Sequence, residues 1–557
     1  MNFFLKYKAL LLVLLVSFIA GAALLRAGLA PTHDGEYHVI RFYEFDKTFR
    51  DGNLYPRWAP DLNNGFGVPL FNYVYPLPNY FASFIHSFGI SFIASVGINM
   101  FVATVIGALF FYLWTKRYWG EAGGAISSIF YSFAPYRFVD MYIRGSVGEV
   151  WALAFFPALL WAYDNFVETK KTKFFIFASI FLSLLIYSHN ILALMFFSFF
   201  LVYAIVLFFQ KKETNTFILY FCLLVVLGLG LAAPFWIPAI FEKNFVRGLE
   251  VFDVTQHFVQ LYELIIPSWG SGFSGTQGFD KMSFQIGIAN IVAVFCVILQ
   301  FLLKRKKHRS YNLQISFFLI SFFIVIFLML SPSIWLWKNI PLISYFQFPW
   351  RFLSLEIVIA AFLAGSLFSK YNFSKLHAKA GYALVIVVVI VLGINYARPA
   401  FYHLRSDSHY ISRSNFIDGT NSVGNAFNTK WLSEIPKKEK NKLVVFSGRG
   451  VVAVVSEKST SYSFKIIIED DSQLIFNNAY FPGWKVFVNE KEVEVKNLDG
   501  KVAFLLKNGS HIVDIRLVST PIQLFSYACF FVSLVLLFFL RKILFFDIIA
   551  RKITSRA

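Results

Sequence analysis

The chain has 557 residues, of which 57% are hydrophobic and only 15% are charged, and it carries a formal net charge of +19. This composition is too apolar for a soluble protein of that length. The basic residues form short clusters between apolar stretches, a pattern that is typical of topology signals and argues against nucleic-acid binding. Each of the three cysteines lies in an apolar run, so no disulfide framework or cysteine metal site is expected.

Apolar stretches long enough to cross a bilayer recur along the chain. A membrane-spanning helix needs about 20 apolar residues, and stretches of roughly that length centre near residues 17, 103, 128, 158, 182, 200, 228, 294, 322, 359, 388 and 531. The sequence therefore predicts a polytopic α-helical protein of the cell membrane with about twelve spans. When the spans alternate, the Lys- and Arg-rich connections fall on one side, which predicts that both termini are cytoplasmic.

Two apolar segments need a separate interpretation. The apolar segment at the N-terminus, centred near residue 17, is interpreted as an uncleaved span. The alternative is a cleaved signal peptide, because basic residues precede its apolar core. The stretch VYPLPNYFASFIHSFGI is interrupted by Pro76 and Pro78, and counting it as a span would break the alternation of charge. We expect it to form a re-entrant or interfacial helix.

The outer connections predict how the chain divides into domains. We expect a transmembrane domain over residues 1–397 with its first outer loop at 26–89, an extracytoplasmic β-rich domain over 398–521, and a final helix with a basic tail over 522–557. Within the β-rich part, KVFVNEKEVEV and KVAFLLKNGSHIVDIRL alternate apolar and polar residues. This pattern predicts a small antiparallel β-sandwich with a hairpin turn at Asn508 and Gly509.

Aromatic residues of this β-rich domain allow two interpretations. Tyr480 and Trp484, on either side of FPG, look exposed in the sequence and could dock an acceptor glycan, because aromatic faces suit sugar rings. The favoured interpretation is a lid with an ordinary aromatic core.

The segment PTHDGEYHVIRF, just after the first apolar stretch, holds two acids, two histidines and an arginine. If it is helical, Asp34, His38 and Arg41 share one face. A carboxylate beside an imidazole and a guanidinium can act as a general base or bind a cation. The alternative is a solvated loop whose charges only avoid lipid.

Mixed polar clusters recur at three other predicted outer ends, within YRFVDMYIRGSVGE, YSHN and QFPWRFLSLE. They supply Asp140, Arg144, Glu149, His189, Asn190, Trp350, Arg351 and, deeper in its helix, Glu356. Each has an ordinary structural explanation, such as interfacial anchoring by Trp and Arg or an acid at a helix start. Their shared side of the membrane is what favours a common site.

A catalytic site at the outer surface needs this mixture of side chains. A carboxylate can take a proton from an acceptor hydroxyl, and arginine can hold a lipid phosphate bidentately. Because the span centres carry almost no charge, the pattern weighs against a transporter, whose ionisable groups usually lie near mid-bilayer. A flippase of lipid-linked glycans and a non-catalytic envelope scaffold remain the alternatives.

Several of these stretches resemble known families. The long motif THDGEYHVIRFYEFDKTFRDGNLYPRWAPDLNNGFGVPLFNYVYPLPNYF, with IRGSVGEVWALAFFPALLWA, YSHN and QFPWRFLSLE, resembles the bacterial and archaeal 6-pyruvoyl-tetrahydropterin synthase-related membrane proteins. NNAYFPGWKVFVN, followed by a final span, resembles the C-terminal part of YfhO-like membrane proteins. Both groups resemble the GT-C superfamily of integral-membrane glycosyltransferases.

The resemblance implies a GT-C fold and roles for individual residues. The acid of the first extracytoplasmic loop would be Asp34, with Glu36 as the fallback and Glu149 as a second acid. The remaining residues would bind donor phosphate or substrate: His38, Arg41, Arg144, His189, Trp350 and Arg351.

The reaction implied by the resemblance is transfer of a hexosyl or pentosyl group on the extracytoplasmic side. The donor would be a polyprenyl-phosphate-linked sugar, and the acceptor a glycan, a lipid or a protein whose hydroxyl Asp34 deprotonates. The acids permit Mg²⁺ or Mn²⁺ without requiring either. The histidine zinc site of the soluble pterin enzyme is not expected, because His33 and His38 have no third histidine at a suitable spacing.

Overall fold

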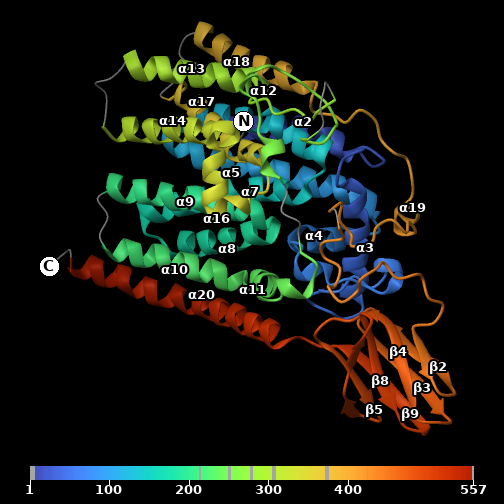
Figure 1. The fold of residues 1–557 in the computed structure, drawn as a ribbon. Helices are drawn as coiled ribbons and strands as arrows, with labels where there is room; N and C mark the ends of the chain where they lie inside the picture. Colours follow the sequence, from blue (N-terminus) through green and yellow to red (C-terminus); the bar gives the residue numbers. More distant parts are fainter. Residues whose placement is uncertain are drawn as a thin grey trace.

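The computed structural model describes residues 7–211, 215–248, 253–275, 280–303, 309–369, 376–422 and 424–554. Long helices pack side by side in a bundle, and a β domain lies at one end of it (Figure 1). We call this end the β-domain end. The helices of the bundle are α2 (Lys8–Gly21), α5 (Phe92–Ser132), α7 (Val147–Thr169), α8 (Thr172–Ser188), α9 (Asn190–Lys211), α10 (Asn215–Leu231), the short α11 (Ala233–Phe241), α13 (Ile288–Leu303), α14 (Arg309–Met329), α17 (Leu353–Ser366), α18 (Leu376–Ile394) and α20 (Pro521–Thr554).

The prediction of about twelve spans is not confirmed. In the described part of the chain, seven helices are long and apolar enough to cross a membrane, or eight if α10 and α11, bent by 76° against each other, form one span. Three further apolar helices, α8, α13 and residues 313–329 of α14, are shorter. Every predicted centre nevertheless lies in a helix, and α5 contains two of them, on either side of a break at Gly120 where φ is +70°.

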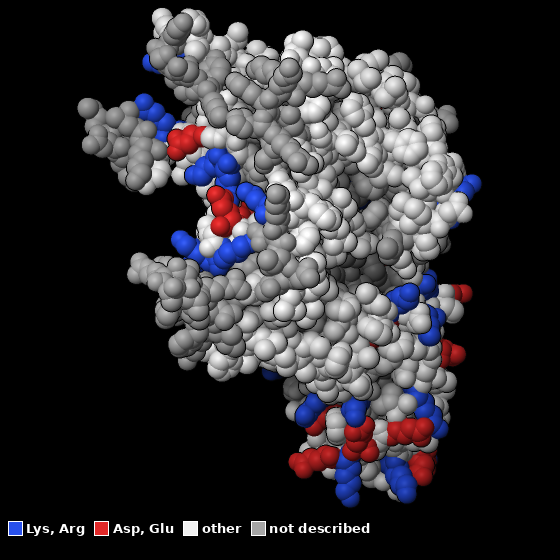
Figure 2. Space-filling view, turned by 90° about the vertical axis from the view of Figure 1, so that its left-hand side faces the viewer, with Lys and Arg blue, Asp and Glu red and all other residues white. Residues whose placement is uncertain are grey.

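Much of the bundle surface is apolar. Large hydrophobic side chains are exposed on several helices, among them Leu219, Phe295, Val391 and Phe538. Figure 2 shows a broad surface without charged side chains, whereas Lys, Arg, Asp and Glu gather in an area at the left, along the right-hand edge and over the β domain. Such an extensive apolar surface is expected where lipid, rather than water, surrounds the helices.

A compact cap forms between α2 and α5. It contains α3 (Gly35–Arg50) and α4 (Leu77–His86), joined by an irregular segment with two short 3₁₀ turns. The stretch expected to be re-entrant or interfacial forms α4, whose ten residues are too few to cross a bilayer. Acid in the first turn of α3 and base in its last turn match the helix dipole.

Short helical turns complete the β-domain end of the bundle. They are α6 (Pro135–Val139), the π-helical turn η4 (Asp140–Arg144), α12 (Leu261–Ile265), α15 (Ile334–Asn339), α16 (Pro341–Ser344), the 3₁₀ turn η8 (Pro349–Phe352) and α19 (Asp407–Ile411).

The β domain is an antiparallel sandwich, as predicted. One sheet has the order β1 (Leu443–Ser447), β4 (Ser472–Ala479), β8 (Lys501–Leu506) and β7 (Lys496–Leu498). The other has the order β2 (Gly450–Lys458), β3 (Ser461–Ile468), β9 (Gly509–Leu517), β5 (Trp484–Val488) and β6 (Lys491–Val493). Inward side chains of both sheets, such as Phe464, Phe476, Phe504 and Ile515, share one core. In the register of the second sheet, Phe464 lies opposite Val513.

Two details of the predicted β domain are wrong. The connection at Asn508 and Gly509 is not a hairpin turn, because β8 and β9 belong to different sheets and the chain crosses between them. Trp484 is not exposed: it is 4% accessible and packs edge-on against Trp58 of the cap, with ring centroids 5.6 Å apart. Half-buried Tyr480 packs on Trp431. Trp484 therefore joins the sandwich to the cap and presents no face to a glycan.

Candidate active site

The acidic motif begins α3, so the helical alternative considered for this segment is the one that the structure shows. Asp34 is the N-cap of α3, and its backbone carbonyl accepts the His38 N–H at 3.1 Å. The backbone N–H groups of His33 and Asp34 donate to the carbonyls of Ile143 and Arg144, each at 2.9 Å. The start of α3 is thereby tied to the π-helical turn η4, which brings two of the predicted polar clusters together.

Glu149 lies at the centre of a buried ion-pair network. Both Nη atoms of Arg144 donate to its carboxylate, at 2.5 and 2.6 Å, and Nε of Arg351 donates to Oε1 at 3.1 Å. Arg144 also donates to Oδ1 of Asp140 at 2.5 Å. Glu149 and Asp140 have no accessible surface. The arginines come from η4 and η8, so the network joins turns that are about 200 residues apart in the chain.

Aromatic rings and an imidazole surround this network. The guanidinium of Arg144 lies 4.8 Å from the ring centroid of Trp350. Nε2 of His189 is 3.7 Å from Oε1 of Glu149, and the ring of Tyr75 lies against that imidazole with centroids 5.0 Å apart. The Leu192 N–H donates to Nδ1 of His189 at 3.2 Å. The proton of a neutral His189 therefore sits on Nε2, facing Glu149.

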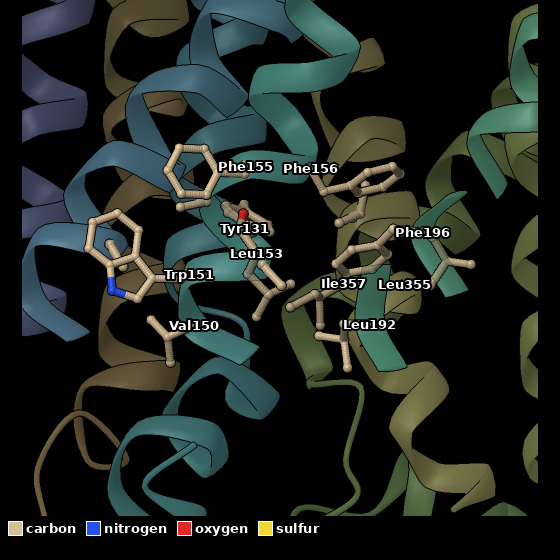
Figure 3. Close-up of a cluster of buried hydrophobic side chains, with 14 of the residues drawn as sticks. Tyr131, Val150, Trp151, Leu153, Phe155, Phe156, Leu192, Phe196, Leu355 and Ile357 are labelled. Atoms are coloured by element: carbon tan, nitrogen blue, oxygen red, sulfur yellow. Dashed lines mark hydrogen bonds between the residues drawn. The ribbon is translucent and has the colours of Figure 1, made fainter. Parts of the chain in front are cut away.

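A layer of apolar packing fixes the helices that carry the network. Figure 3 shows this cluster, to which α7 contributes Val150, Leu153 and Phe156, α9 contributes Leu192 and Phe196, and α17 contributes Leu355 and Ile357. The rings of Phe156 and Phe196 stack at 4.3 Å. Close packing of this kind transmits strain and tolerates little displacement. It therefore limits how far Glu149, Arg144 and Arg351 can move relative to one another.

Asp34 and the Glu149 network form one electrostatic site. Burial raises the pKa of Asp34 above its ordinary value, while the nearby charges of Arg41 and Arg144 act in the opposite direction. Tyr75 lies among the same charges, and burial raises the pKa of its phenol to about 12. A carboxylate with a raised pKa next to guanidinium groups is an arrangement found at catalytic sites.

The other residues of the acidic motif divide between this site and its rim. His38 is buried, and burial holds the pKa of its imidazole well below the usual value. Nε of Arg41 donates to the carbonyl of Gly419 at 2.5 Å. Glu36 forms an ion pair with Arg413 at 2.5 Å, with both side chains about one-third exposed. Glu36 therefore lies at the partly exposed edge of the site and takes no part in the Glu149 network.

Other polar residues were missed or stand apart. Tyr75, Arg413, Gly419 and Asn421 contact the predicted residues. Tyr75 belongs to the long motif but was not predicted as a site residue, and the other three belong to no motif. Glu356 is fully buried, and neither of its carboxylate oxygens has a hydrogen-bond partner among the described residues.

The carboxylates of this site do not fit a divalent cation. In the described ranges, no group of three or more His, Cys, Asp or Glu side chains is close enough to hold a metal ion. Both oxygens of Glu149 accept guanidinium donors, which leaves Asp34 without a second free carboxylate beside it. Mg²⁺ and Ca²⁺ take several oxygen ligands at once, and these carboxylates do not supply such a set.

The fold and this site define an α-helical membrane protein with an ionic site at one end of its bundle. A family model described as "6-pyruvoyl-tetrahydropterin synthase related domain; membrane protein" matches residues 71–400. That match covers more than half of the chain, and the chain belongs to this family of membrane proteins.

Individual similarities are more distant. An uncharacterized protein of Lactococcus lactis subsp. cremoris is 22% identical over 355 residues, which cover 60% of this chain and 55% of that protein. The oligosaccharyltransferase AglB of Archaeoglobus fulgidus, solved with an inhibitory peptide and a dolichol-phosphate, has a TM-score of 0.46 at 13% identity, covering 73% of this chain and 56% of AglB. The mycobacterial arabinofuranosyltransferase AftD has a TM-score of 0.44 at 15% identity, covering 71% of this chain and 27% of AftD. The chain thus spans just over half the length of the first two proteins.

Proposed function

We propose that this protein is an integral-membrane glycosyltransferase of the GT-C type. It would transfer a hexosyl or pentosyl group from a polyprenyl-phosphate-linked donor to an acceptor hydroxyl on the extracytoplasmic side. The observation that carries the proposal is the half-buried carboxylate of Asp34, which lies in one electrostatic site with Arg41 and Arg144 at the β-domain end of the bundle.

Asp34 suits the role of general base. A base works best when its pKa lies near the working pH, and burial raises the pKa of this carboxyl toward that range. Its Oδ1 is held by Asn421 at 2.7 Å, whereas Oδ2 has no hydrogen bond among the described residues. Oδ2 is therefore the oxygen that would take the acceptor proton.

The arginines suit a departing phosphate. Burial and the neighbouring Glu149 raise the pKa of Asp140, which favours its protonated form. With Asp140 neutral, the guanidiniums of Arg41, Arg144 and Arg351 face the carboxyls of Asp34, Glu149 and Asp418. Burial raises the pKa of Asp418 as well, which lowers the negative charge opposing the guanidiniums and favours an anionic ligand. Because Glu149 already holds two of these guanidiniums in place, they need little reorganisation when charge develops on the leaving group.

The proposed reaction follows from these placements. Oδ2 of Asp34 takes the proton of the acceptor hydroxyl, and the acceptor oxygen attacks the anomeric carbon. The bond between that carbon and the phosphate oxygen breaks, and the phosphate leaves with the electron pair, stabilised by the guanidinium charges. Attack from the face opposite the phosphate inverts the anomeric centre.

The test compares lipid-linked sugars and surface glycans by mass spectrometry in a deletion strain complemented with wild type or Asp34→Asn. Removing a general base costs about 10²–10⁴-fold in rate, so the variant should fail to restore the glycan profile and lipid-linked donor should accumulate. Asp253→Asn is the matched control, because this acid is exposed and lies in the connection between α11 and α12. Full restoration by Asp34→Asn at equal protein level would refute the proposal and favour a flippase or a scaffold.

A further inference from the structure

One segment between α18 and the β domain contacts three of the four ionisable residues that α3 and its N-cap contribute to the predicted site. We call residues 413–421, RSNFIDGTN, the Asp418 loop. Within it, Arg413 pairs with Glu36 at 2.5 Å, the Gly419 carbonyl accepts Nε of Arg41 at 2.5 Å, and Nδ2 of Asn421 donates to Oδ1 of Asp34 at 2.7 Å. The partners lie 377 to 387 residues apart in the chain.

Hydrogen bonds within the Asp418 loop and to its neighbours hold the loop in one conformation. Asp418 is fully buried, and its Oδ1 accepts both the N–H and the hydroxyl of Thr420, at 3.0 and 2.8 Å. Its Oδ2 accepts the Phe427 N–H at 3.2 Å. The loop is also docked on the cap, since the Ile417 carbonyl accepts the Asn63 N–H at 2.9 Å. These bonds fix the backbone from which Asn421 reaches Asp34.

Gly419 allows the loop to approach the cap this closely. Its φ of +71° lies in the left-handed region, and a Cβ atom there would stand 2.7 Å from Leu70 and 2.9 Å from Leu62. A larger residue would push the loop away from α3. The close approach is what places the Gly419 carbonyl against Arg41 and the Asn421 amide against Asp34.

We propose that Asn421 is a positioning residue for Asp34. Its amide N–H holds Oδ1, so that Oδ2 is left to face the acceptor, and it favours the ionised carboxylate, because a hydrogen bond to the charged form stabilises that form. The amide cannot itself take up the proton. The role of Asp34 as base rests on the proposed function, whereas the coupling between Asn421 and Asp34 does not.

Other charges also face Asp34 and set the background for the measurement. His33 and Arg41 come from its own segment, Arg144 from η4 and Glu149 from α7. The phenols of Tyr37 and Tyr75 lie within the same electrostatic environment. A substitution at position 421 leaves all of these groups in place. The effect of the amide is therefore the difference in the pH midpoint of Asp34 between the variant and wild type.

The experiment measures the protonation of Asp34 directly in the full-length protein purified in detergent. A diazo reagent esterifies protonated carboxyls, and peptide mass spectrometry gives the pH at which half of Asp34 is labelled. Asn421→Ala should raise this midpoint by about 1 pH unit, because a hydrogen bond to a charged group contributes about that much. Asn421→Asp should raise it further, because a second carboxylate repels the first.

The matched control is Asn415→Ala. Asn415 is an exposed amide of the same loop whose Oδ1 accepts Nε of Arg413 at 3.1 Å, so the variant should leave the midpoint of Asp34 unchanged. If Asn421→Ala does not fold, the nearly isosteric Asn421→Asp carries the test. An unchanged midpoint in both Asn421 variants would overturn the coupling.

A second measurement separates this inference from the proposed function. In the complemented deletion strain, Asn421→Ala should reduce glycan transfer more strongly as the pH falls, because Asp34 is then protonated over a wider range. A shifted labelling midpoint combined with normal transfer by Asp34→Asn would overturn the role of Asp34 as base, and with it the positioning role, but not the coupling.

Discussion

Replacing Glu149 by glutamine should strongly destabilise the bundle. The side chain is fully buried, and its carboxylate accepts two hydrogen bonds from Arg144 and one from Arg351. Glutamine keeps the shape but removes the negative charge, which leaves two buried guanidiniums beside a neutral amide. Breaking a buried ion pair by removing one partner costs about 3–5 kcal/mol.

A double-mutant cycle isolates the interaction from the general effect of substitution. Arg351→Gln alone leaves Glu149 with Arg144 as its only full ion-pair partner, and should also destabilise the bundle. In the double variant one carboxylate and one guanidinium are removed together, and Asp140, no longer repelled by Glu149, can ionise and pair with Arg144 at 2.5 Å. The double variant should therefore be more stable than the sum of the single effects predicts, by about 1–3 kcal/mol.

The assay is thermal unfolding of the purified protein in detergent micelles. The control is Glu492→Gln, which removes an exposed ion pair with Lys485 and should cost at most about 1 kcal/mol. If Glu149→Gln and wild type melt at the same temperature, the carboxylate does not hold the guanidiniums, and the reasoning about the network fails.

Two further predictions concern the cap and the β domain. Burial and the neighbouring Asp61 raise the pKa of Glu44 to about 8; since Glu44 would ionise near its ordinary pKa in the unfolded chain, wild-type stability should fall as the pH rises from about 4.5 to 8. Glu44→Gln should flatten that dependence in melting curves recorded between pH 5 and 9, and an unchanged slope would contradict the assignment. Trp484→Ala should remove packing against Trp58 and Phe476 and cost about 3–5 kcal/mol. Limited proteolysis should then cut the β domain earlier than in wild type; equal cutting rates would mean that the ring is not part of the core.

The helices could be predicted from the sequence because the signal for them is local. An apolar stretch of sufficient length forms a helix wherever lipid surrounds it, and each predicted centre lies in one. The number of spans did not follow, because α8, α13 and residues 313–329 of α14 are shorter apolar helices, α10 bends by 76° into α11, and α5 holds two of the predicted centres. Strand pairing did not follow either: the alternation around Asn508 predicts two strands, but only tertiary packing decides which sheet each one joins.

The candidate site, like the fold, could be predicted only in part from the sequence. The spacing of Asp34, His38 and Arg41 indicated one shared face only if the segment was helical, and the structure supplies that helix as α3, with Asp34 as its N-cap. The predicted role of each residue remains a hypothesis until activity is measured. The partners of these residues had no local signal, since Asn421 lies far along the chain from Asp34 and belongs to no recognisable motif. Trp484 was misjudged because its covering residue, Trp58, comes from a distant loop.

The distance between the acidic motif and the Asp418 loop has a consequence for biosynthesis. Asn421 lies 387 residues after Asp34, and synthesis at about 5–20 residues per second needs about 20 to 80 s to cover that interval. During this time α3 emerges with Asp34, Glu36 and Arg41 lacking the partners they have in the finished fold. A chain that stops before the Asp418 loop never completes these contacts, so translation must pass the loop before the site can assemble.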